Sequence, residues 1–149
     1  MSETIRSADE RAVDRSSRLA IPPGVPRGAL SDFVDDLQAE GRLTFTRSDA
    51  LEALGVTPNG LKQAALRLAK RGRLVSPRRG FYVIVPLEYR ARGAPPGERW
   101  LPALLRYQGG RYGEVRTEGE EVTVEADRYV RPTRCGPWQL RFTGVRSPG

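Results

Sequence analysis

Two adjacent arginines, Arg78 and Arg79, stand in a short break between two apolar runs, in the stretch LVSPRRGFYVIVP. An apolar run, a break with proline and glycine, and a second apolar run are typical of a β-hairpin. A hairpin tip does not require two adjacent like charges, and such charges repel each other. The pair therefore indicates a ligand for the tip, and the alternative is two solvated turn residues.

A second set of polar side chains lies on the stretch PNGLKQAALRLAKRG, which begins at Pro58. Its apolar residues recur every three or four positions, which predicts a helix with one inward stripe. The stripe consists of Leu61, Ala64, Ala65, Leu68 and Ala69. In the major groove, Asn and Gln pair with adenine, and Arg and Lys pair with guanine. We expect base edges to be read by Asn59, Lys62, Gln63 and Arg67.

Contacts with the phosphate backbone are expected from helix starts and from the hairpin tip. Hydroxyl and N–H groups at the start of a helix can hold a phosphate. Thr46 with Asp49 resembles a capping box at one such start, and capping alone is the alternative reading. A hairpin tip lies against phosphates or the minor groove, where arginine is favoured. The expected backbone contacts are Thr46, Arg47, Ser48, Thr57, Lys70, Arg78 and Arg79.

The charge of the chain favours a polyanionic partner. The formal net charge is +7 and the pI about 10.3, and residues 53–87 hold seven basic side chains and no acidic one. Such a balance is typical of binding to nucleic acid or to an acidic membrane face. No apolar run approaches the roughly 18 residues of a membrane span, and no secretory signal is visible. With a single cysteine, Cys135, no internal disulfide can form, so we expect a cytoplasmic protein.

Catalysis is not expected from these residues. The chain has no histidine, which removes the commonest general base, and one cysteine is too few for a structural zinc site. No glycine-rich phosphate loop is present. Glu121, Glu125 and Asp127 could suggest a metal-dependent nuclease, but no lysine follows Lys70 to complete the usual carboxylate–lysine pairing. We expect no enzyme, no cofactor and no metal.

The elements around these residues predict an α+β protein, a winged helix-turn-helix domain followed by a small β-rich C-terminal segment. Residues 1–28 form a polar extension and a Pro/Gly-rich linker, and residues 29–90 form the winged domain. A first helix, with Ser31 as its N-cap and Gly41 just past its end, is followed by a short strand at 42–46. Two helices on either side of a turn at 55–58 and the hairpin complete the domain. Residues 91–149 hold a linker, a short helix at 101–107, a polar flexible stretch from Gln108, and strands at 121–126 and 138–145.

The stretch from residue 30 to residue 106 resembles the N-terminal winged-helix domain of the AbiEi family of antitoxins. The most specific part is RGRLVSPRRGFYVIVP, followed by a Pro/Gly linker and a helix with Trp and leucines. The family consists of bacterial transcriptional regulators of type IV toxin–antitoxin and phage-abortive-infection systems. The resemblance implies autorepression through inverted repeats upstream of the operon. It also implies a nucleotidyltransferase-like toxin that need not contact the antitoxin.

The segment EADRYVRPTRCGPWQLRF resembles a later piece of the family's C-terminal domain, which is required for antitoxin activity. The helical segment that the family has before this piece is absent here, so we expect a shortened member that keeps the regulatory half. The expected function is that of a transcriptional regulator that binds double-stranded DNA sequence-specifically. An inverted-repeat site could be filled by a dimer or by two monomers. The alternatives are a winged-helix module for an acidic protein partner and an RNA-binding protein.

Overall fold

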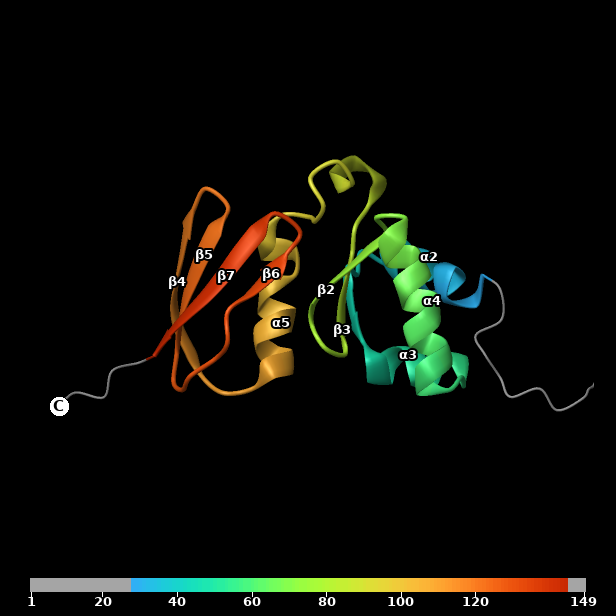
Figure 1. Cartoon of the computed structure of the whole chain (residues 1–149), viewed down its shortest axis with the longest axis horizontal. Coiled ribbons are helices and arrows are strands. Elements are labelled where there is room, and N and C mark those ends of the chain that lie inside the picture. The colour runs from blue at the N-terminus through green and yellow to red at the C-terminus, as the bar shows by residue number, and fades with distance from the viewer. Residues whose placement is uncertain (1–27, 145–149) are drawn as a thin grey trace, which may run out of the picture.

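The computed structural model describes residues 28–144, and nearly all of the expected N-terminal extension lies outside them. Three helices and a three-stranded sheet form the N-terminal part, and one helix with a four-stranded sheet forms the C-terminal part. The hairpin of the smaller sheet lies between the helices of the N-terminal part and α5, the helix Leu101–Gln108 of the C-terminal part (Figure 1). The α+β class and the β-rich C-terminal segment are therefore confirmed.

The helices of the N-terminal part begin and end at the expected local signals, with one exception. Their bounds are α2 (Ala29–Ala39), α3 (Arg47–Leu54) and α4 (Pro58–Lys70). Thr46 and Asp49 form the capping box of α3, and Thr57 caps α4 with Pro58 at its first position. The expected N-cap of α2 is wrong, because Gly28 occupies that position and Ser31 lies inside the helix. No helix within residues 28–144 is long and apolar enough to cross a membrane.

The small sheet has the order β1-β3-β2, with both pairs antiparallel. Its strands are β1 (Thr44–Thr46), β2 (Leu74–Arg78) and β3 (Phe81–Ile84). The break between the two apolar runs, Pro77 to Gly80, was expected to form the turn, but Pro77 and Arg78 belong to β2 and the turn consists of Arg79 and Gly80 alone. Pro77 is tolerated because β2 is an edge strand of this sheet.

The C-terminal part begins with two short 3₁₀ helices, Leu87–Tyr89 and Gly97–Arg99, and continues with α5 (Leu101–Gln108). Its sheet has the order β4-β5-β7-β6, in which β5 and β7 are parallel and the other pairs antiparallel. The strands are β4 (Tyr112–Glu118), β5 (Glu121–Ala126), β6 (Thr133–Cys135) and β7 (Trp138–Gly144).

The stretch from Gln108 was expected to be polar and flexible. The prediction of flexibility is wrong, because Tyr112–Glu118 form the strand β4. Six of the seven residues of β4, which is an edge strand, are exposed. Tyr112 and Val115 are the only large apolar side chains of β4, so it lacks the alternation of apolar and polar residues that identified β5 and β7. The three residues of β6 were not expected either.

The hairpin β2–β3 contributes to two apolar clusters, one on each of its faces. Leu74 and Ile84 pack with the helices α2–α4, whereas Phe81 and Val83 pack with Trp100, Leu104 and the C-terminal sheet. Phe81 is 2% exposed and Val83 is fully buried. Apolar residues on both sides of position 91 thus share one cluster, and the division of the chain there stays a prediction.

Candidate nucleic-acid interface

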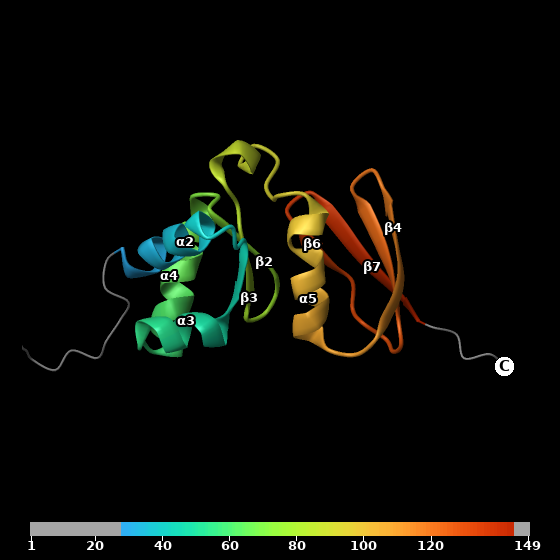
Figure 2. The same cartoon turned by 180° about the vertical axis from the view of Figure 1, so that it is seen from behind.

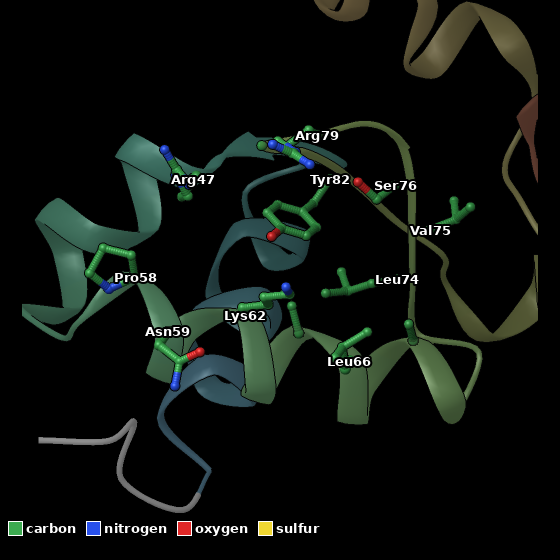
Figure 3. A pocket seen from close by; sticks show the side chains of 13 residues that line it. Arg47, Pro58, Asn59, Lys62, Leu66, Leu74, Val75, Ser76, Arg79 and Tyr82 are labelled. Carbon is green, nitrogen blue, oxygen red and sulfur yellow. The ribbon is translucent and has the colours of Figure 1, made fainter. Parts of the chain in front are cut away.

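A groove of about 680 Å³ lies between α4 and the hairpin β2–β3. Residues of α3, α4 and the hairpin form its walls (Figure 3). The polar and aromatic residues that line it are Arg47 on α3, Asn59 and Lys62 on α4, and Ser76, Arg79 and Tyr82 on the hairpin. The groove is open to solvent.

The structure brings four of the predicted contact residues together in this groove: Arg47, Asn59, Lys62 and Arg79. Gln63, Arg67 and Lys70 are also exposed, but they follow the solvent face of α4 and do not line the groove. On the buried face of α4, Leu61, Ala64, Ala65 and Leu68 form the expected stripe. Ala69 is an exception, because it is exposed and lines the groove.

The cations of this surface have no local counter-charge. Among the described residues, no carboxylate lies within 4.0 Å of Arg47, Lys62, Arg67, Lys70 or Arg79. Arg73 differs, because its guanidinium contacts Asp35 at 2.5 Å and donates to Ser31 at 2.6 Å, which ties the start of β2 to α2. The unpaired cations are therefore available to an external anion.

Arg78 does not join this groove, although it is the neighbour of Arg79. Its Nε donates to Oε1 of Gln108 at 2.5 Å, and its guanidinium donates to the carbonyl of Arg131. The same group lies 5.7 Å from the centroid of the Phe142 ring. Burial, and next the charge of Arg131, lower the pKa of Arg78. Of the two arginines, Arg79 faces the groove and Arg78 the C-terminal part.

A second, smaller pocket of about 360 Å³ adjoins the start of α3. It is lined by Thr46, Arg47, Ser48, Arg79, Gly80 and Tyr107. The Thr46 hydroxyl accepts from the Asp49 amide at 3.1 Å, and the Asp49 carboxylate accepts from the Thr46 amide at 3.0 Å. Thr57 lies at the start of α4, where its hydroxyl accepts from the Gly60 amide at 3.0 Å.

Sequence reasoning missed three polar or aromatic residues of these two sites: Ser76, Tyr82 and Tyr107. The ring of Tyr82 stacks on Phe45 with centroids 5.0 Å apart, and burial raises the pKa of its phenol. Strand alternation next to the buried Phe81 could have placed Tyr82 on the groove side. Tyr107 belongs to α5, and only the tertiary structure places it beside Arg79.

The N-terminal part matches one known family. Residues 32–85 match the family model described as transcriptional regulator, AbiEi antitoxin. The match begins in α2 and ends one residue after β3, so it includes both walls of the groove. Tyr107 and the rest of the C-terminal part lie outside the matched residues. Neither the curated proteins nor the solved structures gave a match.

Proposed function

We propose that the protein is a sequence-specific DNA-binding repressor of its own operon, on the premise that residues 32–85 match the AbiEi family of antitoxin transcriptional regulators. The observation that carries the proposal is the cationic surface around α4, in which five basic side chains have no acidic partner within the described residues. A surface of this kind attracts a polyanion, and each phosphate it neutralises releases counterions.

In this proposal α4 is the recognition helix and enters the major groove with its N-terminal half leading. Asn59 and Gln63 carry amides that pair with adenine, and Lys62 and Arg67 pair with guanine. Leu66, which is 49% exposed between these polar residues, offers an apolar contact for a thymine methyl group.

The phosphate contacts come from the residues around α4 and the hairpin turn. Arg47 and Arg79 flank the groove from one side, and Lys70 lies near the C-terminal end of α4. Ser48 and Thr46 present hydroxyl groups at the start of α3, and Thr57 does so at the start of α4. The Thr46 hydroxyl accepts one bond in its capping box and keeps its hydrogen for donation to a phosphate.

The protein acts in the cytoplasm by binding rather than by catalysis. Inverted repeats upstream of the operon are filled by a dimer or by two monomers of the protein. The toxin is a functional partner that the protein need not contact. The C-terminal part is the candidate for any antitoxin activity.

The experiment that tests this function compares two duplexes, one from just upstream of the gene and one with the scrambled sequence. Fluorescence anisotropy at several salt concentrations measures the Kd for each. We expect the upstream duplex to bind at least about 10³-fold more tightly, as specific sites typically do. Equal affinity for both duplexes would contradict the proposal and favour an acidic protein or RNA as the partner.

A matched pair of variants tests the groove itself. Lys62→Ala and Arg116→Ala each remove one positive charge, but Arg116 lies on β4, on the far side of the C-terminal sheet (Figure 1). Loss of a base contact costs about 1–3 kcal/mol of binding free energy. We therefore expect Lys62→Ala to weaken binding to the upstream duplex by that amount and Arg116→Ala to leave it unchanged. Equal effects would show that net charge alone drives binding.

A further inference from the structure

The hairpin turn that carries Arg79 is held from both sides by hydrogen bonds. The Arg79 carbonyl accepts from the Tyr107 hydroxyl at 2.7 Å, and the Gly80 carbonyl accepts from the Arg47 amide at 2.8 Å. Arg47 begins α3 and Tyr107 belongs to α5, and these helices lie on opposite sides of the hairpin (Figure 2). Two consecutive peptide units are therefore fixed by different parts of the molecule.

The residues beside this turn are fixed in the same way. The Pro77 carbonyl accepts from the Thr133 hydroxyl, and the Ser76 hydroxyl lies 2.8 Å from the carbonyls of both Arg78 and Phe81. The carbonyls of Pro77, Arg79 and Gly80 thus each accept a bond, and the single Ser76 hydroxyl hydrogen goes to the carbonyl of either Arg78 or Phe81. The turn is thus ordered before any ligand arrives, which lowers the entropic cost of binding.

Tyr107 packs directly against the backbone of this turn. Gly80 has a φ of +80°, and a Cβ atom added to it would lie 2.5 Å from the Tyr107 hydroxyl oxygen. The Tyr107 ring also contacts Phe81, with ring centroids 5.3 Å apart. A side chain at Gly80 would therefore require the Tyr107 hydroxyl to move away from the turn.

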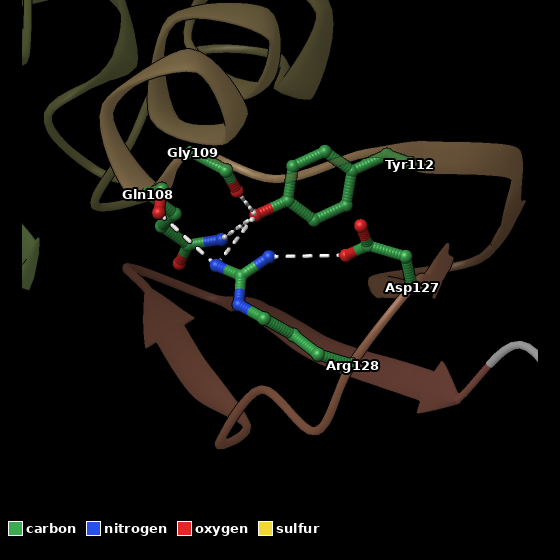
Figure 4. A network of polar contacts seen from close by, with 5 residues as sticks. All are labelled: Gln108, Gly109, Tyr112, Asp127 and Arg128. Carbon is green, nitrogen blue, oxygen red and sulfur yellow. Dashed lines mark hydrogen bonds and ion pairs between the residues drawn. The ribbon is translucent and has the colours of Figure 1, made fainter.

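The end of α5 is in turn anchored to the C-terminal sheet (Figure 4). Arg128 donates to the Gln108 carbonyl at 3.0 Å, and the Tyr112 hydroxyl donates to the Gly109 carbonyl at 2.6 Å. The side chain of Gln108 accepts the bond from Arg78. The C-terminal part therefore holds the hairpin at Arg78 and at Arg79 through neighbouring residues of one helix.

The pocket at the start of α3 has the chemistry of a phosphate site. Arg47 and Arg79 enter it from different elements, Ser48 adds a hydroxyl, and neither arginine has an acidic partner among the described residues. Arginine guanidinium groups bind phosphate oxygens with charge-assisted hydrogen bonds. Tyr107 donates its only hydroxyl hydrogen to the Arg79 carbonyl, so it has none left for a phosphate oxygen.

We propose that this pocket binds one phosphodiester of the DNA duplex, and that Tyr107 of α5 is the positioning residue that directs Arg79 toward it. The inference rests on the proposed DNA binding, and it extends the interface to a helix outside the family match. The C-terminal part is then a component of the DNA-binding surface, because it sets the geometry of the wing.

A double-mutant cycle of Tyr107→Phe and Arg79→Ala on the upstream duplex tests the proposal. Tyr107→Phe removes the hydroxyl and keeps the ring against Phe81. We expect Arg79→Ala to lower the salt slope by about 1, as loss of a phosphate contact does. Tyr107→Phe should shift the slope in the same direction and raise the Kd about threefold, and the double variant should match Arg79→Ala alone. Tyr129→Phe is the control, since Tyr129 is 80% exposed and should leave both values unchanged.

Methylphosphonate substitution of single phosphates in the duplex identifies the contact as a phosphodiester. One substitution should weaken binding of the wild-type protein and have no effect on Arg79→Ala. The positioning role would be overturned by a Tyr107→Phe variant that binds as the wild type does, or by one that loses affinity equally with and without Arg79. A wild-type protein that binds no duplex would overturn the proposed function instead, and this site with it.

Discussion

Arg78 and Arg79 are neighbours in the chain and differ in every contact they make. Arg78 is bonded to Gln108 and Arg131 on the side of the C-terminal part, where burial lowers its pKa. Arg79 faces the groove with no acidic partner among the described residues. Arg78, the last residue of β2, is thus held by contacts within the fold, whereas Arg79 in the turn keeps its charge unpaired among the described residues.

Gly80 is the residue on which this arrangement depends most directly. We expect Gly80→Ala to lower the free energy of unfolding by more than about 1–2 kcal/mol, because the left-handed φ penalises any other residue and the new Cβ displaces Tyr107. Gly119→Ala is the matched control, since Gly119 has a φ of +62° and no atom within 4 Å of an added Cβ. Urea unfolding of both variants measures the difference. Equal losses would show that the contact with Tyr107 adds nothing.

At the scale of the element, α3 is the least supported helix of the N-terminal part. It spans Arg47–Leu54, and Ala50 is its only buried residue. Its start depends on the capping box and on the bond from the Arg47 amide to the Gly80 carbonyl. Since Arg47 and Ser48 are proposed phosphate contacts, the cap also fixes part of the interface.

The capping box predicts the outcome of two substitutions. Thr46→Ala should destabilise the protein by about 1 kcal/mol, because the Asp49 amide then loses its acceptor. Thr46→Ser keeps the hydroxyl and should lose much less. Thermal unfolding followed by circular dichroism measures both. A serine variant as unstable as the alanine variant would mean that the threonine methyl group, rather than the cap, is the stabilising part.

At the scale of the whole molecule, the hairpin joins two cores that would otherwise be small. Its two faces pack with the helices on one side and with α5 and the large sheet on the other. Neither face can be exposed without loss of buried apolar area, so the two parts should unfold together.

Two probes follow the two parts separately. Trp100 and Trp138 both lie in the C-terminal part, whereas most helical residues lie in α2–α4. We expect tryptophan fluorescence and far-ultraviolet circular dichroism to give the same urea midpoint. Leu104→Ala removes a fully buried side chain of α5 and should lower the free energy of unfolding by about 2–5 kcal/mol. Both urea midpoints should therefore fall together. A shift of the fluorescence midpoint alone would show two independent units.

Local patterns in the sequence determined most of the N-terminal part of this fold. The caps at Thr46 and Thr57, the apolar stripe of α4 and the hairpin are set by residues within a few positions of each other, so the sequence alone is enough to identify them. Ser31 failed as a cap because Gly28 begins the helix one turn earlier. The uncompensated charge of residues 53–87 is likewise visible in the sequence.

The tertiary structure alone decided which side of each element is covered, and by what. β4 has no sequence signal because an exposed edge strand buries almost nothing on either face. The DNA contact of Arg78 stays a prediction, and no local pattern reports its bond to Gln108, which is 30 positions away in the chain. Tyr107 is 28 positions from Arg79 and was missed for the same reason. Local hydrogen bonds and periodicity are encoded by near neighbours, whereas the environment of a side chain depends on residues that only folding brings close.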